Sequence, residues 1–276
     1  MPLIQPEKIA DIIKDVALQI IAPRFQKLNQ SDIHTKTGPS DLVTIADLEA
    51  EEKLTQYFKD ILPGSLVIGE EAVSQNKADL SILGKETDPI WIIDPVDGTH
   101  NFAHGKPVYG TIVALVQGQE VIQGWIYDIP NDRFAIAEQR SGVELSAHKV
   151  TYPIMTKPLN QSKGFISRKF LPEKLKKDLK PVLNEEFGEI DTYLCCAHEY
   201  LDILASNAHY SLYSRIKPWD HFAGAMMLRE SGGITKNWDQ SDYTASDLTG
   251  GLLCTSDEDT WHTIYDLLLK NYISKG

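Results

Sequence analysis

The sequence predicts a mixed α/β protein with a sizeable core, and three observations support this prediction. Apolar repeats of helical spacing alternate with short apolar runs of strand length. Hydrophobic residues make up 42% of the chain and charged residues 24%, which is typical of globular proteins and excludes disordered or fibrous ones. A chain of 276 residues buries roughly three quarters of its extended surface on folding, so we expect one large domain or two ordinary ones.

The N-terminal part of the chain predicts two amphipathic helices. Apolar residues repeat at helical spacing from Ile9 to Ile20, until Pro23 ends the pattern. A polar loop at residues 36–41 precedes a second helical pattern over residues 50–58, which Pro63-Gly64 breaks.

Strands dominate the next part of the chain. The run Leu66–Ile68 leads into Gly69-Glu70-Glu71, and Trp91–Ile93 leads directly into Asp94-Pro95-Val96-Asp97-Gly98-Thr99. Further strands follow over residues 108–137, with a hairpin around Gln117-Gly118-Gln119. Each acidic motif is therefore expected at the end of a strand.

We expect a division of the chain near Gly142–Pro158, where Pro153 and Pro158 interrupt the pattern. It separates an α+β subdomain, residues 1–148, from an α/β subdomain, residues 149–276, in which helical and strand patterns alternate.

The charge balance is acidic, with 27 basic and 39 acidic residues and a net charge of −12. Such a charge repels nucleic acid and anionic lipid, so we expect neither as a direct partner. Lysines 174, 176, 177 and 180 alternate with Glu173 and Asp178, which indicates a solvated helix face. No apolar stretch approaches the length of about 18 residues that a membrane helix requires.

The cytoplasm is the expected location. Glu7, Lys8 and Asp11 interrupt the apolar residues that a signal peptide would need near the N-terminus. Cys195, Cys196 and Cys254 are an odd number of cysteines and two are adjacent, which suits free thiols packed as small apolar groups in a reducing compartment.

Asp94 and Asp97 lie at the end of an apolar strand, where ligands bind in α/β folds. Pro95 restricts Asp94 to an extended conformation. The two carboxylates and the Val96 carbonyl are hard oxygen ligands of the kind Mg²⁺ prefers, and the N–H groups of Gly98-Thr99 suit a phosphate if a helix begins there. A surface Asp-Gly turn is the alternative for this hexapeptide.

Glu70 and Asp220 each have a simple structural explanation on their own. Glu70 closes a strand and could be a surface acid, and Asp220 opens a helical pattern and could be its N-cap. Four carboxylates at strand ends and helix starts would repel one another strongly, however, unless cations lay between them.

Other enzyme classes lack their signatures here. The chain has no Gly-x-Ser-x-Gly elbow, no phosphate-binding Gly-x4-Gly-Lys loop and no Gly-x-Gly-x-x-Gly. His198-Glu199 begins like a zinc-protease motif, but Asp202 stands where the second histidine belongs, which favours a helix-surface pair. No Cys-x5-Arg loop follows Cys195-Cys196, which argues against a cysteine phosphatase.

Taken together, Gly69-Glu70-Glu71, Asp94-Pro95-Val96-Asp97-Gly98-Thr99 and Trp219-Asp220 followed by Gly232-Gly233 resemble the inositol monophosphatase family. This family belongs to the Mg²⁺-dependent, lithium-sensitive phosphatases that include fructose-1,6-bisphosphatase. Asp41-Leu42-Val43-Thr44 with Asp47 also resembles its N-terminal segment, so the likeness extends from the opening helix to about Cys254. It implies a layered αβαβα sandwich and a homodimer.

The resemblance also implies roles for individual residues. It gives the metal ligands as Glu70, Asp94, Asp97, Asp220 and the Val96 carbonyl. Thr99 and Asp47 resemble the pair that orients and deprotonates the attacking water beside Glu70. Gly98 and Thr99 resemble the phosphate cradle, and Lys36 lies in a loop that reaches the active site.

The chain departs from the family on the substrate side, where Asp220 borders the leaving group. Leu194-Cys195-Cys196-Ala197 replaces a small-residue segment that contacts the sugar, so Cys196 is its counterpart here. Tyr213 stands in place of a glutamate that hydrogen-bonds inositol hydroxyls. The loss of that acceptor argues against inositol as the best substrate.

The sequence therefore predicts a phosphomonoesterase that acts on a small phosphorylated metabolite with two or three Mg²⁺ ions. Alternatives are a relative acting on histidinol phosphate, fructose bisphosphate or a 3′-phosphonucleotide, and an interaction protein of the transcription machinery.

Overall fold

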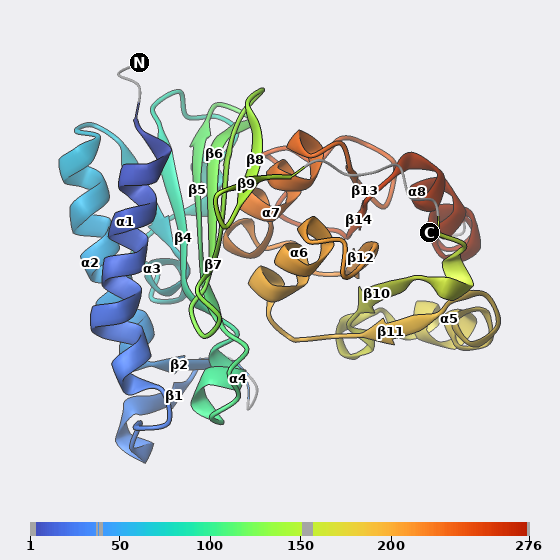
Figure 1. Cartoon of the computed structure of the whole chain (residues 1–276), viewed down its shortest axis with the longest axis horizontal. Helices are drawn as coiled ribbons and strands as arrows, with labels where there is room; N and C mark the ends of the chain where they lie inside the picture. The colour runs from blue at the N-terminus through green and yellow to red at the C-terminus, as the bar shows by residue number, and fades with distance from the viewer. Residues whose placement is uncertain (1–3, 37, 39–40, 151–156, 275–276) are drawn as a thin grey trace.

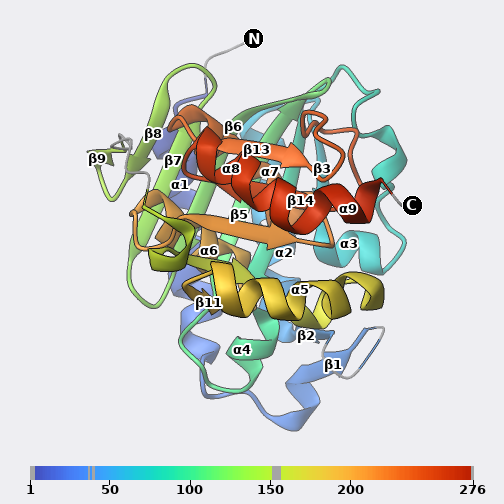
Figure 2. The ribbon, with the colours of Figure 1, turned by 90° about the vertical axis from the view of Figure 1, so that its right-hand side faces the viewer.

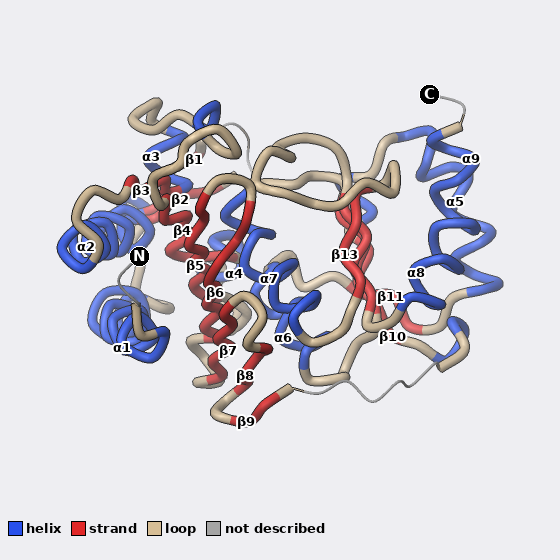
Figure 3. Tube along the Cα trace, turned by 90° about the horizontal axis from the view of Figure 1, so that it is seen from above, coloured by secondary structure: helices blue, strands red, loops and turns tan. Residues whose placement is uncertain are grey.

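Helices and sheets alternate in five layers across the molecule (Figures 1 and 3). The computed structural model describes residues 4–36, 38, 41–150 and 157–274. From one side to the other, the layers are α1 with α2, a seven-stranded sheet, α6 with α7, a five-stranded sheet, and α5 with α8 and α9 (Figure 3). The predicted αβαβα sandwich is confirmed.

The helices have the following bounds: α1 Pro6–Val16, α2 Ile45–Ile61, α3 Glu70–Ser74, α4 Thr99–Ala103, α5 Glu173–Glu186, α6 Cys196–Leu204, α7 Pro218–Glu230, α8 Glu258–Ile264 and α9 Lys270–Ile273. The first predicted helix is α1, which continues through a π-helical turn, Ala17–Ile21, as far as the proline. The second is α2, and Thr44 caps it by accepting a hydrogen bond from the Ala46 N–H.

The seven-stranded sheet runs in the order β3-β4-β5-β6-β7-β8-β9, with β3 and β4 parallel and the other pairs antiparallel. Its strands are β3 Leu66–Gly69, β4 Ile90–Asp97, β5 Gly110–Gln117, β6 Glu120–Asp128, β7 Arg133–Glu138, β8 Gly142–Leu145 and β9 His148–Lys149. The predicted hairpin is the β5–β6 turn. Both faces of β4 are buried under helices, which explains its continuous apolar run.

The five-stranded sheet has the order β11-β10-β12-β14-β13. Its strands are β10 Lys163–Ile166, β11 Glu189–Asp191, β12 Tyr210–Tyr213, β13 Ile234–Asn237 and β14 Leu252–Thr255. Figure 2 shows α5, α8 and α9 crossing its outer face. The lysines predicted to be solvated lie on α5, where Lys174, Lys177 and Lys180 are exposed.

A small antiparallel pair, β1 Ile33–Thr35 and β2 Leu42–Thr44, leads into α2. Within the predicted loop at residues 36–41, Thr37, Pro39 and Ser40 lie outside the described residues. So does Pro153, in the connection between the two large sheets. Among the residues that the structure does describe, no helix is long and apolar enough to cross a membrane.

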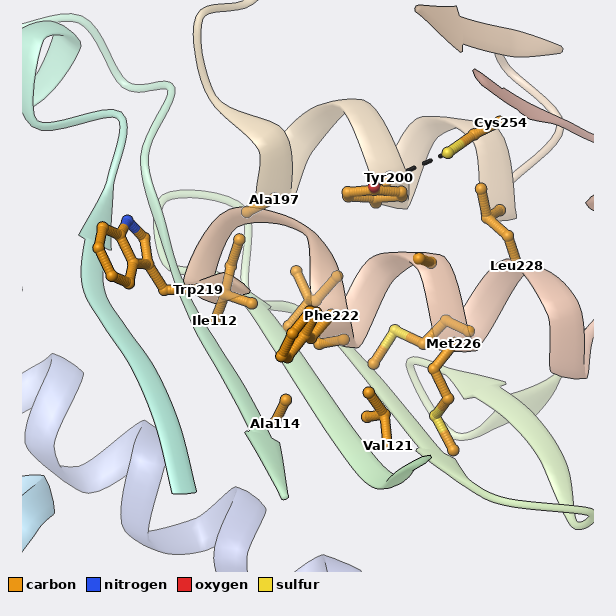
Figure 4. Close-up of a cluster of buried hydrophobic side chains, with 14 of the residues drawn as sticks. Ile112, Ala114, Val121, Ala197, Tyr200, Trp219, Phe222, Met226, Leu228 and Cys254 are labelled. Carbon is orange, nitrogen blue, oxygen red and sulfur yellow. Dashed lines mark hydrogen bonds between the residues drawn. The ribbon is translucent and has the colours of Figure 1, made fainter. Parts of the chain in front are cut away.

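The largest shared core lies between the seven-stranded sheet and the helices α6 and α7 (Figure 4). Phe222 and Met226 of α7 face the sheet, while Tyr200 of α6 lies 3.8 Å from the Cys254 thiol through its hydroxyl (Figure 4). Cys195 and Cys254 are buried here as free thiols, as predicted, whereas Cys196 is only half-buried.

Close packing of α6 on α7 requires a glycine at position 224. A Cβ added there would lie 2.2 Å from Cδ2 of the Tyr200 ring. We expect Gly224→Ala to lower the free energy of unfolding by about 1–3 kcal/mol, because overpacking in a dense core costs that much. The measurement is urea unfolding followed by circular dichroism.

Gly38→Ala is the matched control, because a Cβ at Gly38 meets nothing within 4 Å and the residue has no positive φ. We expect the control to stay within about 0.5 kcal/mol of the wild type. Equal stabilities of Gly224→Ala and the wild type would contradict the packing argument.

Candidate active site

One cavity of about 1040 Å³ gathers nearly all the predicted site residues. Its walls come from the loop after β1, the carboxyl ends of β3 and β4, and the starts of α6 and α7. Every predicted site residue except Asp47 lines it: Lys36, Glu70, Asp94, Val96, Asp97, Gly98, Thr99, Cys196, Tyr213 and Asp220. Asp47 lies behind the wall and contacts Thr99.

Three carboxylates converge on one side of this cavity. Glu70, Asp94 and Asp220 each place an oxygen within 4.8 Å of the others. Glu70 and Asp94 come together because β3 and β4 are parallel neighbours, so their carboxyl ends meet at one sheet edge. Asp220 reaches the same point from the first turn of α7.

Asp220 is not the N-cap of α7. The cap position belongs to Lys217, and Asp220 is the third residue of the helix. The prediction that Asp220 alone could be an N-cap is therefore wrong. The explanation of Glu70 as a surface acid is incomplete, because Glu70 lines the cavity.

The electrostatics of the three-carboxylate group suit a divalent cation. Burial, together with the neighbouring Glu70 and Asp97, raises the pKa of both Asp94 and Asp220 well above the ordinary value. Among the described residues, Asp94 Oδ1 is buried without a hydrogen-bond partner. The atoms that this group offers to a metal ion are all carboxylate oxygens, so the three residues fit a hard cation such as Mg²⁺.

Asp97 faces the cavity but does not belong to that group. Its Oδ2 accepts hydrogen bonds from the Ala197 N–H at 2.5 Å and from the Cys195 thiol at 3.2 Å. Burial raises its pKa, against these hydrogen bonds. One oxygen of Asp97 is therefore engaged in holding the start of α6 against the end of β4.

Thr99 and Asp47 form a hydrogen-bonded pair. Thr99 Oγ1 lies 3.0 Å from Asp47 Oδ1 and 2.8 Å from the Val96 carbonyl oxygen, and its single proton can go to only one of them at a time. Asp47 Oδ2 accepts from the backbone and the hydroxyl of Thr44. Burial raises the pKa of Asp47 to about 6, so the carboxylate is mostly ionised at neutral pH.

Gly98 initiates α4, so the helix predicted to begin at this point is present. The glycine has a φ of +85°, which is left-handed. A Cβ there would lie 2.8 Å from the Val108 carbonyl oxygen and 3.2 Å from the Cys195 sulfur. Only glycine therefore allows the chain to turn from β4 into α4 at this point.

Among the described residues, Lys36 forms ion pairs with the acidic residues at the start of α3. Its ammonium nitrogen lies 2.7 Å from Glu70 Oε1 and 2.6 Å from Glu71 Oε1. Burial alone would lower the pKa of Lys36, but the charges of Glu70 and Glu71 outweigh it and hold the pKa above its ordinary value.

On the substrate side, Cys196 and Tyr213 line the cavity as expected. Burial raises the pKa of both side chains well above the ordinary values, so both stay protonated. The Tyr213 hydroxyl is buried near the Glu199 carboxylate, and their interaction opposes the rise that burial causes in the pKa of Glu199.

Glu199 is a cavity residue that the sequence analysis missed. His198 and Glu199 were predicted to be a helix-surface pair, but only 5% and 4% of these residues are exposed, so that prediction is wrong. His198 Nε2 lies 3.2 Å from Asp128 Oδ1, whereas Glu199 lines the cavity and accepts from the Tyr193 N–H at 3.0 Å. Its place two residues after the altered sugar-contacting segment was the available signal.

Comparison with known proteins agrees with this geometry. Residues 7–270 match the model of the inositol monophosphatase family. The chain belongs to the inositol monophosphatase family. It is therefore a phosphatase that hydrolyses phosphomonoesters, and the family is generally metal-dependent.

Two curated relatives resemble much of the chain. An inositol-1-monophosphatase of Bacillus subtilis is 28% identical over 241 residues, covering 86% of this chain and 88% of the relative. The Nus factor SuhB of Vibrio cholerae is 28% identical over 219 residues, covering 77% and 78%.

Solved structures share the fold. The inositol monophosphatase-II of Staphylococcus aureus bound to 2′-AMP has a TM-score of 0.79 at 22% identity, covering 98% of this chain and 95% of that one. The Thermotoga maritima enzyme has a TM-score of 0.78 at 22% identity, covering 98% and 97%.

Charge repulsion at the three-carboxylate group makes a prediction about stability. In a chelator at pH 7, Asp94→Asn should raise the unfolding temperature by about 2–4 °C, which corresponds to about 1 kcal/mol for a chain of this size. The pKa of Asp94 is raised above 3.8 in the folded state, so the stability it contributes is present at low pH and is lost as pH rises through the folded pKa. The gain should therefore shrink near pH 4.

Asp11→Asn is the control, because Asp11 is an exposed carboxylate on α1. It should change the unfolding temperature little at either pH. Destabilisation by Asp94→Asn at pH 7 in chelator would contradict the repulsion argument.

Proposed function

We propose that this chain is a Mg²⁺-dependent phosphomonoesterase in which Glu70, Asp94, Asp97, Asp220 and the Val96 carbonyl hold two or three ions. The observation that carries this proposal is the group of three carboxylates within 4.8 Å of one another, one with a buried oxygen that no described residue satisfies. When bound, Mg²⁺ supplies positive charge for the phosphate and lowers the pKa of water.

Thr99 and Asp47 are proposed to prepare the attacking water, beside Glu70. When the Thr99 hydroxyl donates to Asp47, its oxygen lone pairs are left to accept a proton from a water in the cavity. A pKa of about 6 leaves the Asp47 carboxylate charged at neutral pH, so it can accept the threonine proton in turn. This relay needs no protein nucleophile.

Gly98, Thr99 and Lys36 are proposed to position the phosphate. Gly98 turns the chain from the end of β4 into the first turn of α4, where backbone N–H donors suit phosphate oxygens. Lys36 would balance the charge that the phosphate adds beside Glu70 and Glu71.

The leaving group is proposed to lie against Tyr213, Cys196 and Asp220. Tyr213 offers one hydroxyl and an aromatic face, which favours a flatter or less hydroxylated group than inositol. Histidinol phosphate, fructose bisphosphate and a 3′-phosphonucleotide remain alternatives, and the 2′-AMP held by the staphylococcal structure is a nucleotide of this general kind.

A second candidate function is interaction with the transcription machinery, which the likeness to a relative described as a Nus factor favours. Clustered buried carboxylates argue against a purely structural role, because Lys36 pairs with Glu70 and Glu71 alone, and Asp94 and Asp220 still repel Glu70 without a further cation. Release of phosphate by the purified chain would separate the two functions.

Several finer features remain proposals. We propose a homodimer, lithium sensitivity and a division into residues 1–148 and 149–276, all on the resemblance to the family. The cytoplasm is the proposed compartment, since all three cysteines are free thiols.

Removal of one metal ligand tests the proposed activity. With Mg²⁺ and a phosphomonoester panel, Asp220→Asn should lower kcat/KM at least tenfold, because it removes a charge from the metal site and no cap is lost. A chelator should abolish wild-type activity, and added Mg²⁺ should restore it. Phosphate release is the readout.

Asp11→Asn again serves as the control and should retain full activity. Wild-type activity that persists in excess chelator, or Asp220→Asn activity within threefold of the wild type, would overturn the proposed metal site.

Tyr213→Glu tests the substrate side. Inositol 1-phosphate should be hydrolysed by the wild type without being the best substrate. The variant should raise kcat/KM for inositol 1-phosphate relative to the 3′-phosphonucleotide, because a carboxylate accepts hydrogen bonds from sugar hydroxyls. The measurement is kcat/KM for both substrates, with thermal unfolding as the check on folding.

Tyr57→Glu is a matched control on the surface of α2, where Tyr57 is 36% exposed, and it should not change the ratio. An inositol 1-phosphate preference above tenfold in the wild type would contradict this role of Tyr213.

A further inference from the structure

A second group of possible metal ligands lies beside the three carboxylates, and it contains a thiol and an imidazole. Cys196, Asp220 and His221 each place a ligand atom within 4.8 Å of the others, and all three line the cavity. Cys196 is the first residue of α6, whereas Asp220 and His221 lie at the start of α7. The packing of α6 on α7 therefore brings together side chains that are distant in the sequence.

The ring of His221 is oriented as metal-binding imidazoles are oriented. Its Nε2 lies 2.9 Å from the Arg215 carbonyl oxygen, which can only accept, so Nε2 carries the proton of the neutral ring and Nδ1 carries the lone pair. Histidines that bind metal ions donate their other ring N–H to a carbonyl in this way, which fixes the tautomer and the direction of the ring. The Tyr213 ring also packs against the imidazole, with 4.4 Å between the ring centroids.

The Nδ1 lone pair can be given to a metal ion at a small cost. It faces the Tyr200 hydroxyl at 3.1 Å, and the same hydroxyl lies 3.8 Å from the Cys254 thiol. The hydroxyl therefore keeps a partner when the imidazole binds a metal ion, and no buried polar group is left unsatisfied.

The chemistry of this group suits zinc better than magnesium. Mg²⁺ prefers oxygen ligands in an octahedral arrangement, whereas Zn²⁺ takes sulfur, nitrogen and oxygen in a tetrahedral one. Zinc bonds of about 2.0–2.3 Å place ligand atoms roughly 3.3–3.6 Å apart, so side-chain rotations that close about 1 Å are sufficient. Burial raises the pKa of the Cys196 thiol, but a coordinated zinc ion displaces the thiol proton to the solvent.

We propose that Cys196, His221 and Asp220 bind a zinc ion. Asp220 also belongs to the three-carboxylate group, so the two groups share one ligand. One carboxylate does not neutralise two divalent ions, and the ions repel each other across it, so zinc lowers the affinity of the three-carboxylate group for Mg²⁺ and inhibits the enzyme. The zinc site itself does not depend on the proposed function, whereas the inhibition rests on it.

Zinc titration of the purified chain without Mg²⁺ tests the site. The affinity for Zn²⁺ is measured by competition with a chromogenic chelator. Cys196→Ser should weaken zinc binding at least tenfold, because a hydroxyl replaces the thiolate ligand. His221→Gln should weaken it as strongly, and its amide can still donate to the Arg215 carbonyl. With Co²⁺ as the probe, the wild type should show a thiolate-to-metal charge-transfer absorption that Cys196→Ser abolishes.

Matched controls exist for both substitutions. Cys254→Ser changes a buried thiol outside the cavity and keeps a group that can contact the Tyr200 hydroxyl. His262→Gln changes an exposed histidine of α8. Both controls should keep the zinc affinity and the cobalt absorption of the wild type. Thermal unfolding without metal ions checks that every variant is folded.

Competition with Mg²⁺ tests the shared use of Asp220. Saturating Mg²⁺ should weaken zinc binding to the wild type at least fivefold. In assays of phosphate release with Mg²⁺, Zn²⁺ should inhibit the wild type, and Cys196→Ser should require at least tenfold more zinc for half-inhibition. Each activity is expressed relative to the same protein without zinc.

The outcomes separate this inference from the proposed function. Zinc affinity that either Cys196→Ser or His221→Gln leaves unchanged would overturn the zinc site. Zinc binding that Mg²⁺ does not weaken would overturn the competition through Asp220. A chain that binds zinc as expected but releases no phosphate with Mg²⁺ alone would overturn the proposed function and leave the zinc site supported.

Discussion

Repulsion among buried carboxylates is the constraint on which the rest of the structure depends. Like charges 4 Å apart repel by about 4 kcal/mol near a protein surface, so a chain does not gather Glu70, Asp94 and Asp220 without other interactions to oppose the cost. The packed sheet and the helices on both of its faces supply those interactions. Because β4 is buried along its whole length, its carboxyl end is fixed whether or not a cation is bound.

The backbone around the acidic group is held by side chains that do not face the reaction. Glu51 of α2 accepts the N–H groups of Glu71 at 2.8 Å and Ala72 at 2.7 Å, which anchors the first turn of α3 and therefore Glu70. This contact leaves no room for a side chain at Gly69, where a Cβ would lie 2.1 Å from the Glu51 carboxyl carbon. Burial raises the pKa of Glu51 to about 7, against these two hydrogen bonds. Positioning thus depends on a second carboxylate behind the first.

The sequence was sufficient to predict the elements of the fold and the position of the acidic residues, because both follow from local pattern. Apolar spacing located α1, α2 and β4, and the motif at the end of β4 located Asp94 and Asp97. The layer order came from resemblance to a family. Local pattern could not show that Asp220 is past the cap of α7, nor that Glu199 turns inward, because both depend on how α6 and α7 pack. Cys196 and His221 meet for the same reason, because the two helices that carry them are distant in the sequence.

The rim of the substrate side shows how this chain differs from the small-residue pattern of its family. Leu194 has a φ of +53°, lines the cavity and is 41% exposed. A left-handed conformation costs roughly 1–2 kcal/mol for a residue with a Cβ, whereas glycine adopts it freely. The backbone therefore adopts a turn that glycine would favour, although the residue carries a large apolar side chain. Backbone strain of this kind persists where the surrounding structure enforces it, and it concentrates at functional sites. A leucine held in this way adds an apolar surface to the cavity that Tyr213 also lines, so the substrate side is defined by shape and apolar contact as well as by hydrogen bonds.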